Sequence, residues 1–138
     1  MNKIIFNSAD RPVLVYKRRN LKKCITELFR LERCSFQKIS YIFCSDEYLL
    51  KLNNQYLNHN TYTDILTFLL SAKDKPIESE IYISMDRVKE NAKTYKVSYQ
   101  TELLRVMIHG ALHLCGYDDK NNEAKAQMRK KEDFYMHL

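Results

Sequence analysis

The stretch that most constrains the fold is residues 99–115, which is apolar on nearly every side when it is wound as a helix. Its polar residues Glu102, Arg105, His109 and His113 are spaced 3, 4 and 4 apart, so they form one stripe along the helix. The rest of its surface carries Leu103, Leu104, Val106, Met107, Ile108, Ala111, Leu112 and Leu114. Burying imidazoles and a guanidinium without partners would cost several kcal/mol. We therefore expect a helix that is buried on most sides and whose polar stripe faces partners or a cleft.

Hydrophobic spacing along the rest of the chain predicts strands in the middle and helices towards both ends. The candidate strands are residues 3–7, 12–15, 36–45, 65–70 and 80–85, with a turn or loop over residues 71–79. The candidate helices are residues 17–32, 46–56, 86–95, 99–115 and 121–136, with Ser45 or Asp46, Asp86 and Ser98 as N-caps. This order predicts an α+β fold, a small mixed central sheet with helices packed around it.

The composition indicates one domain over residues 1–138 and an anionic partner. The chain has two Gly and two Pro, and no linker or repeat is visible. Its formal net charge of +6 favours nucleic acid first and an acidic membrane surface second, although surplus lysines can also serve solubility alone. We find no apolar run of membrane-spanning length and no signal-peptide core. The four cysteines form no C-x-x-C pair, so we expect reduced thiols in a cytoplasmic protein.

His109 and His113 are spaced so that one metal ion can bind both of them. Imidazoles at positions i and i+4 of a helix converge on one ion, as in the H-E-x-x-H helix of zinc proteases. Gly116 is placed to end the helix, and Asp118 or Asp119 just beyond it can supply a third ligand. The resulting H-x3-H-x5-D pattern predicts a metal site on a helix and the turn after it.

Neighbouring residues limit what this site can be. Gly110 stands where the zinc proteases carry their glutamate general base, so peptide hydrolysis is disfavoured. Cys115 lies two residues after His113 and points to another side of the helix, so we expect it to pack in the core. The alternative to a metal site is that the two histidines bridge to Glu102 and other polar groups of the core.

Three blocks of the sequence resemble motifs of the YbeY family of bacterial endoribonucleases, also called rRNA maturation factors. Residues 109–119, HGALHLCGYDD, resemble the H-G-x-L-H-L-x-G-Y-D-H signature of that family. Residues 61–68, TYTDILTF, resemble its P-T-D-V-L-S-F strand. Residues 80–92, EIYISMDRVKENA, resemble its G-D-I-x-I-S-x-x-x-A segment, and the three blocks follow one another in the order of the family.

The resemblance implies one metal ion, usually taken to be zinc, that three histidines hold. By position these ligands fall on His109, His113 and Asp119, so an aspartate replaces the third histidine. A carboxylate is an acceptable zinc ligand, and it can shift the preference of the site towards oxygen-loving ions. Asp118 matches an aspartate of the family signature and is the less favoured ligand.

A second departure from the family pattern concerns an arginine. The family often carries one shortly before its T-D block, and the corresponding stretch, residues 56–60, has none. Arg105, on the same stripe as the histidines, is the candidate catalytic residue that can stabilise phosphate instead. The alternative for Arg105 is an ion pair with a core carboxylate such as Glu102 or Asp64. Asp64 itself can orient a metal ligand or cap a turn.

The resemblance and the basic charge together predict a single-strand-specific, metal-dependent endoribonuclease. Its expected role is rRNA maturation, including 16S rRNA 3′-end processing, and ribosome quality control. We expect zinc as the cofactor and rRNA precursors and the ribosomal subunit as partners, with neither DNA nor a membrane. Basic residues of the helix 17–32 and of the last helix (Lys125, Arg129, Lys130 and Lys131) can track a single strand. Two alternatives remain: a metal-dependent hydrolase of another substrate class, and a ribosome-associated binding protein with a structural metal.

Overall fold

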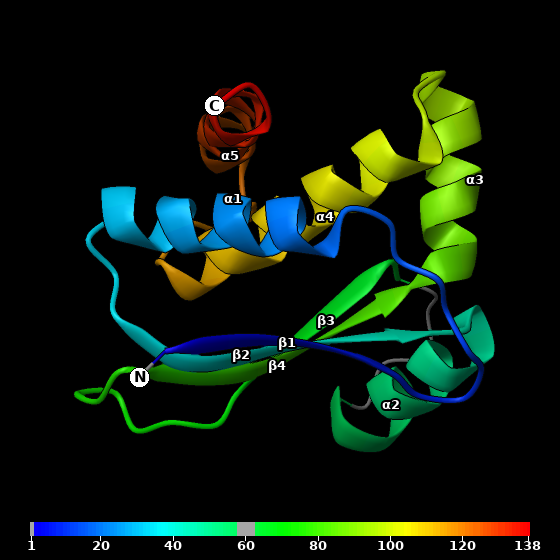
Figure 1. Cartoon of the computed structure of the whole chain (residues 1–138), viewed down its shortest axis with the longest axis horizontal. Coiled ribbons are helices and arrows are strands. Elements are labelled where there is room, and N and C mark those ends of the chain that lie inside the picture. The colour runs from blue at the N-terminus through cyan, green and yellow to red at the C-terminus, as the bar shows by residue number, and fades with distance from the viewer. Residues whose placement is uncertain (1, 58–62) are drawn as a thin grey trace.

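The computed structural model describes residues 2–57 and 63–138, which form a four-stranded mixed sheet with helices on both faces (Figure 1). In chain order the elements are β1 (Lys3–Ser8), α1 (Arg18–Leu31), β2 (Phe36–Cys44), α2 (Asp46–Leu57), β3 (Ile65–Leu69), β4 (Ile77–Ser84), α3 (Met85–Tyr95), α4 (Tyr99–Leu114) and α5 (Asn122–Met136). This architecture confirms the predicted α+β class. Within the described residues, no helix has both the length and the apolar character that crossing a membrane requires.

The strand order β1-β2-β4-β3 leaves β3 at one edge of the sheet. β1, β2 and β4 are parallel, and β3 runs antiparallel to β4, with Ile65 opposite Ile83. Parallel neighbours need long crossover connections, which α1 supplies between β1 and β2. The single antiparallel strand makes the sheet mixed, as predicted.

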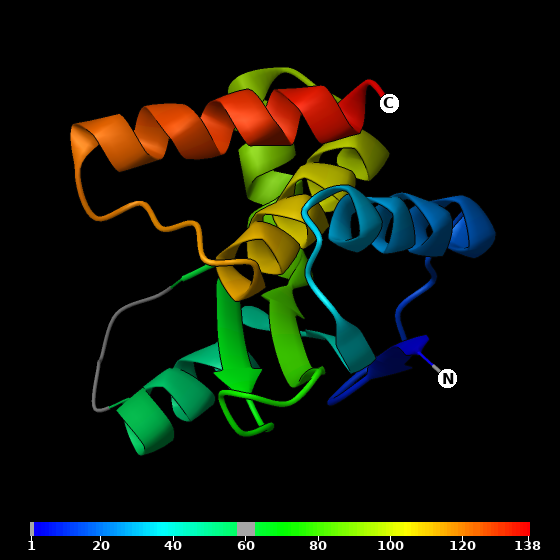
Figure 2. The ribbon, with the colours of Figure 1, turned by 90° about the vertical axis from the view of Figure 1, so that its left-hand side faces the viewer.

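The two faces of the sheet are covered by different helices. α1 and α4 lie on one face, α5 packs beyond α4, and α2 covers the opposite face (Figures 1 and 2). Alternate residues of a strand point to opposite faces. Ile81 and Ile83 of β4 therefore join the main core beneath α1 and α4, whereas Tyr82 packs in a smaller cluster around Leu49 of α2 and Leu66 of β3.

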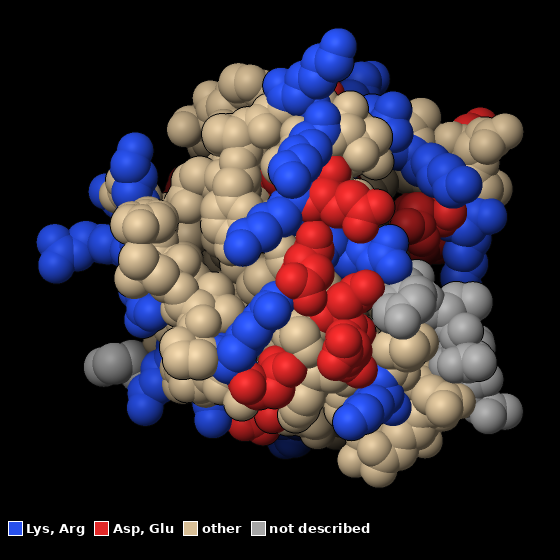
Figure 3. All heavy atoms as spheres, turned by 90° about the vertical axis from the view of Figure 1, so that its right-hand side faces the viewer, with Lys and Arg blue, Asp and Glu red and all other residues tan. Residues whose placement is uncertain are grey.

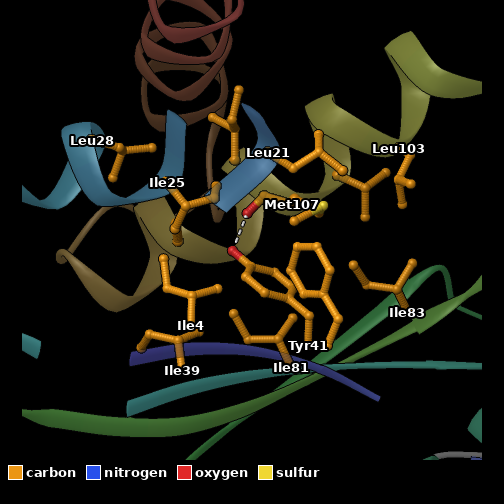
Figure 4. Close-up of a cluster of buried hydrophobic side chains, with 14 of the residues drawn as sticks. Ile4, Leu21, Ile25, Leu28, Ile39, Tyr41, Ile81, Ile83, Leu103 and Met107 are labelled. Carbon is orange, nitrogen blue, oxygen red and sulfur yellow. Dashed lines mark hydrogen bonds between the residues drawn. The ribbon is translucent and has the colours of Figure 1, made fainter. Parts of the chain in front are cut away.

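The main core lies between the sheet and the helices α1 and α4 (Figure 4). Tyr41 rises from β2 into this core, and its hydroxyl donates a hydrogen bond of 2.9 Å to the backbone carbonyl of Met107. This bond ties β2 to the middle of α4 and offsets the cost of burying the hydroxyl. α4 is thus fixed by its apolar sides, and its polar stripe is left to build a site.

The predicted strand at residues 12–15 was wrong. These residues form no strand; Val15 is buried, and Val13 packs against the core while its amide donates to Ser8 Oγ at 3.2 Å. Their apolar character therefore serves packing of a connecting segment rather than strand pairing. The pattern alone could not separate these two uses.

Two element starts also differ from the prediction. β4 begins at Ile77 rather than residue 80, because its first residues pair with the beginning of β2, where Phe36 lies opposite Ile77. α3 begins at Met85 and is capped by Ser84, whose hydroxyl accepts the amide of Arg87 at 3.2 Å. The predicted cap Asp86 lies instead in the first turn of α3, where its carboxylate accepts a hydrogen bond from Arg11.

Candidate metal centre

The end of α4 positions the two histidines and the turn that follows them. His109 and His113 lie one turn apart on α4, as the stripe predicts. Gly116 has φ 102°, a left-handed conformation that favours glycine. The amide of Gly116 donates to the carbonyl of His113 and that of Tyr117 donates to the carbonyl of Leu112, each at 3.1 Å. This pair of bonds is the Schellman motif, which stops the helix and turns the chain back past its own last turn.

That reversal brings Asp119 to the histidines. The Nε2 atoms of His109 and His113 are 3.1 Å apart, and the carboxylate of Asp119 lies 3.7 Å from Nε2 of His109. One ligand atom from each residue lies within 4.8 Å of the others. Two imidazole nitrogens and one carboxylate oxygen are a donor set that suits zinc and leaves a coordination position open. We call these three residues the triad.

Asp118, the other candidate ligand, faces a different group. Its carboxylate accepts the backbone amide of Lys120 at 3.2 Å, which is a local turn contact. Asp119 is about half exposed, with a side-chain accessibility of 48%, so it can approach an ion from the open side. The arrangement therefore favours Asp119 over Asp118 as the third ligand.

Glu132 of α5 is the residue of the site that sequence reasoning missed. Its carboxylate lies 2.6 Å from Nδ1 of His109, and the side chain is 7% accessible. A carboxylate on Nδ1 keeps the proton on that nitrogen and leaves Nε2 free to bind a metal. The sequence does carry one sign of this role: Glu132 falls on the same helical face as Met128 and Tyr135. That face is buried, and an unpaired carboxylate there would be costly.

Arg105 binds two buried carboxylates, of which Glu132 also contacts His109. Its Nε and Nη2 donate to the Glu102 carboxylate at 2.9 and 2.5 Å, and its Nη1 donates to Glu132 at 3.3 Å. The hydrogen bonds to Glu102 raise the pKa of the Arg105 guanidinium above its usual value, against the opposing effect of burial. The ion pair with Glu102 that we weighed as the alternative is therefore present, while the second partner is Glu132 and not Asp64.

A second carboxylate, Glu32 at the end of α1, holds the turn that carries Asp119. It accepts hydrogen bonds from the Tyr117 hydroxyl at 2.7 Å, from Lys131 Nζ at 3.0 Å and from the Tyr135 hydroxyl. Burial alone would raise the pKa of the Glu32 carboxyl, but these three donors outweigh it and leave that pKa below its usual value. Glu32 thus fastens the turn after Gly116 to α1 and α5 and limits its movement.

Two hollows are lined in part by residues of the triad. The first, which we call the α5 hollow, has a volume of about 590 Å³ and is lined by His109 and Asp119 together with Lys125 and Arg129 of α5. The second, the β3 hollow, has a volume of about 570 Å³. It is lined by His113, by side chains of β3 and by Lys73 and Lys75 of the loop that leads to β4. The triad therefore stands where a ligand can approach from either side.

The positive charge does not cover the whole surface. On the side where α2 and α3 lie, acidic side chains gather at the centre among scattered Lys and Arg (Figure 3). Asp46 and Asp86 are hydrogen-bonded there, to Arg87 and Arg11 respectively. The two hollows, by contrast, are lined by basic residues together with residues of the triad.

Gly110 faces the sheet rather than the triad. A Cβ atom at this position would lie 2.9 Å from Cδ1 of Ile65 and 3.2 Å from Cγ2 of Ile81. A glutamate here would thus be directed into an apolar interface, which adds a packing reason to the absence of a protease-type base. Cys115 packs against the main core, as predicted, and burial raises the pKa of its thiol.

Replacing Gly110 with alanine is expected to lower the free energy of unfolding by about 1 kcal/mol. Overpacking a core costs roughly 1–3 kcal/mol, and the higher helix propensity of alanine returns about 1 kcal/mol of that cost. Urea-induced unfolding measures the difference. An alanine variant more stable than the wild type would show that Ile65 and Ile81 move aside without cost.

The stretch without the family arginine lies partly beyond the described residues. The described residues stop at Leu57, the last residue of α2, and resume at Thr63. Asn58, His59 and Asn60 therefore lie outside them. Just before β3, the backbone carbonyl of Asp64 accepts the amide of Ser84 at 3.0 Å, which ties the start of β3 to the end of β4. Whether Asp64 also orients a metal ligand stays a prediction.

Comparison with known proteins gives one consistent family. A family model described as Endoribonuclease YbeY matches residues 6–138. The endoribonuclease YbeY of Flavobacterium psychrophilum is 50% identical over 109 residues, which are 79% of this chain and 77% of the relative. That of Cytophaga hutchinsonii is 42% identical over 135 residues, or 98% of this chain and 94% of the relative. The solution structure of TM1509 from Thermotoga maritima matches with a TM-score of 0.67 at 29% identity, covering 98% of this chain and 87% of that one.

Proposed function

Because this chain belongs to the endoribonuclease YbeY family, we propose that it is a zinc-dependent endoribonuclease that cuts single-stranded RNA. Its substrates are precursors of ribosomal RNA, including the 3′ end of 16S rRNA, and its partner is the ribosomal subunit. Through this activity it acts in rRNA maturation and ribosome quality control in the cytoplasm. Residues 1–138 form a single endoribonuclease domain.

The observation that carries the proposal is the convergence of His109, His113 and Asp119 at the end of α4. Their ligand atoms lie within 4.8 Å of one another, at positions that match the metal-binding signature of the family. An isolated pair of helical histidines would be weaker support, because such pairs also occur as packed polar groups. Here Glu132 holds Nδ1 of His109, and the Nε2 atoms of the two histidines lie 3.1 Å apart with Asp119 beside them.

His109, His113 and Asp119 would hold the ion, and Glu132 fixes the ring of His109. When bound, the metal supplies a Lewis acid and a water of lowered pKa. Arg105 is the candidate catalytic cation: three of its five N–H groups donate to Glu102 and Glu132, and the others remain for a phosphoryl oxygen. A guanidinium so held can stabilise the negative charge that a phosphodiester gains in the transition state without rearranging first.

The test is metal removal and restoration. Elemental analysis of the purified protein is expected to find one zinc ion per chain. Dialysis against a chelator is expected to abolish cleavage of a labelled single-stranded RNA, and one equivalent of zinc is expected to restore it. The same RNA annealed to its complement and the corresponding single-stranded DNA serve as controls, and neither should be cut. Cleavage that persists in metal-free protein would overturn the proposal.

A further inference from the structure

The triad lies at the junction of the α5 hollow and the β3 hollow, with a different ligand facing each. His109 and Asp119 line the α5 hollow, and His113 lines the β3 hollow. We propose that one RNA strand crosses the triad from one hollow into the other. Lys125 and Arg129 bind phosphates on one side of the cleaved bond, and Lys73 and Lys75 bind them on the other side. This inference rests on the proposed function.

The α5 hollow offers two cations that have no partner among the described residues. Lys125 and Arg129 are four residues apart on α5 and so lie on one face of that helix. Within residues 2–57 and 63–138, neither side chain makes a hydrogen bond or an ion pair, whereas Arg105 in the same hollow is bound to Glu102 and Glu132. A phosphate that enters this hollow therefore meets Lys125 and Arg129 as its uncompensated charges.

The carboxylates of the α5 hollow do not cancel this attraction. Glu102 and Glu132 are both nearly inaccessible, and Arg105 and His109 take up their oxygens. Asp119 and Asp133 line the hollow as exposed carboxylates. In the proposed enzyme Asp119 binds the metal ion, so Asp133 alone opposes Lys125 and Arg129, and the rim stays positive, which suits a polyanion.

The β3 hollow has an apolar floor and a cationic end. Its floor includes Ile65, Leu69 and Ile77, and Leu69 is 58% exposed although it belongs to a strand. Lys73 and Lys75, on the loop between β3 and β4, are exposed and also line this hollow. Single-stranded nucleic acid has apolar base faces and anionic phosphates, so a floor of aliphatic side chains beside lysines matches both parts of it.

Open space on both sides of the triad matches internal cleavage. An enzyme that removes nucleotides from a chain end needs space on one side of the reacting phosphate, whereas an endonuclease needs a path on both sides. The hollows have volumes of about 590 and 570 Å³, so there is space on both sides of the triad. The geometry thus specifies a path for the strand and not merely a basic surface.

Two double variants test this path. Lys125→Ala with Arg129→Ala and Lys73→Ala with Lys75→Ala are each expected to lower kcat/KM for a 12-nucleotide RNA by about tenfold. Each is also expected to reduce the slope of log(kcat/KM) against log[salt] by about 1.4, since one phosphate contact to a single strand contributes about 0.7. Lys3→Ala with Lys38→Ala is the matched control. These lysines are exposed on paired residues of β1 and β2, and their removal should change neither quantity.

Zinc affinity and substrate truncation separate the possible failures. All three double variants should bind zinc as the wild type does, because none of them removes a ligand. Shortening the RNA at its 5′ end should abolish the effect of one double variant, and shortening it at its 3′ end should abolish the effect of the other. If the wild type cleaves RNA but the variants behave like the Lys3 and Lys38 control, or both respond to the same truncation, the path is wrong. If the wild type holds no metal or cleaves no RNA, the proposed function fails instead.

Discussion

Replacing His113 with alanine is expected to remove the bound metal and the RNA cleavage together. His113 supplies one of three ligand atoms, and its Nε2 lies 3.1 Å from that of His109. Replacing residues that merely support a ligand already costs roughly 10–100-fold in metal affinity. We therefore expect more than about 100-fold weaker zinc binding and cleavage at the level of a blank preparation. Competition with a chromogenic chelator measures the affinity, and cleavage of the labelled RNA measures the activity.

His137→Ala is the matched control for this variant. His137 follows α5 and is exposed, and its Nδ1 lies 2.8 Å from the carbonyl of Asp133, away from the triad. It should therefore keep the full zinc content and activity. Wild-type cleavage by metal-free His113→Ala would contradict the metal-dependent mechanism, because the measured nuclease would then be a contaminant or the ion would serve structure alone.

Short-range spacing made much of the centre predictable from the sequence. His109 and His113 are one turn apart, so the helical period alone places them together. Asp119 followed from the same local logic, because Gly116 in a Schellman motif reverses the chain at once and returns it past the last turn. Contacts within about ten residues depend on backbone geometry, which the residue types themselves restrict.

Contacts between distant segments were not predictable in this way. Glu132 meets His109 from 23 residues further along the chain, and Glu32 meets Tyr117 across 85 residues. Both depend on how α1 and α5 pack over α4, which the apolar pattern permits but does not specify. Arg105 illustrates the limit, since the sequence left Glu102 and Asp64 open as its partners and the fold supplied Glu102 and Glu132. The strand predicted over residues 12–15 was wrong for the same reason, because a buried connecting segment and a strand share one apolar pattern.

Replacing Glu132 with glutamine is expected to weaken zinc binding by about 10–100-fold. The Glu132 carboxylate has two acceptor oxygens, one for His109 Nδ1 and one for Arg105 Nη1. Glutamine keeps the shape of the side chain but replaces one of these acceptors with an N–H donor. If its oxygen accepts from Arg105, its amide faces Nδ1 and favours the proton on Nε2, the atom that must bind the metal. If its oxygen accepts from His109, the amide faces the guanidinium. Neither orientation satisfies both neighbours. The imidazole ring of His109 is then no longer held with Nε2 free to bind the metal.

The expected defect of Glu132→Gln is a lower affinity for zinc, so saturating zinc should restore most of its cleavage activity. Saturating zinc should restore none of the activity of His113→Ala. Glu123→Gln, a matched change at an exposed position of the same helix, should leave zinc affinity unaltered. The fold should persist, because Arg105 keeps its two bonds to Glu102, and circular dichroism checks this. Wild-type zinc affinity in Glu132→Gln would show that the turn held by Glu32, and not the carboxylate on Nδ1, sets the position of the ligands.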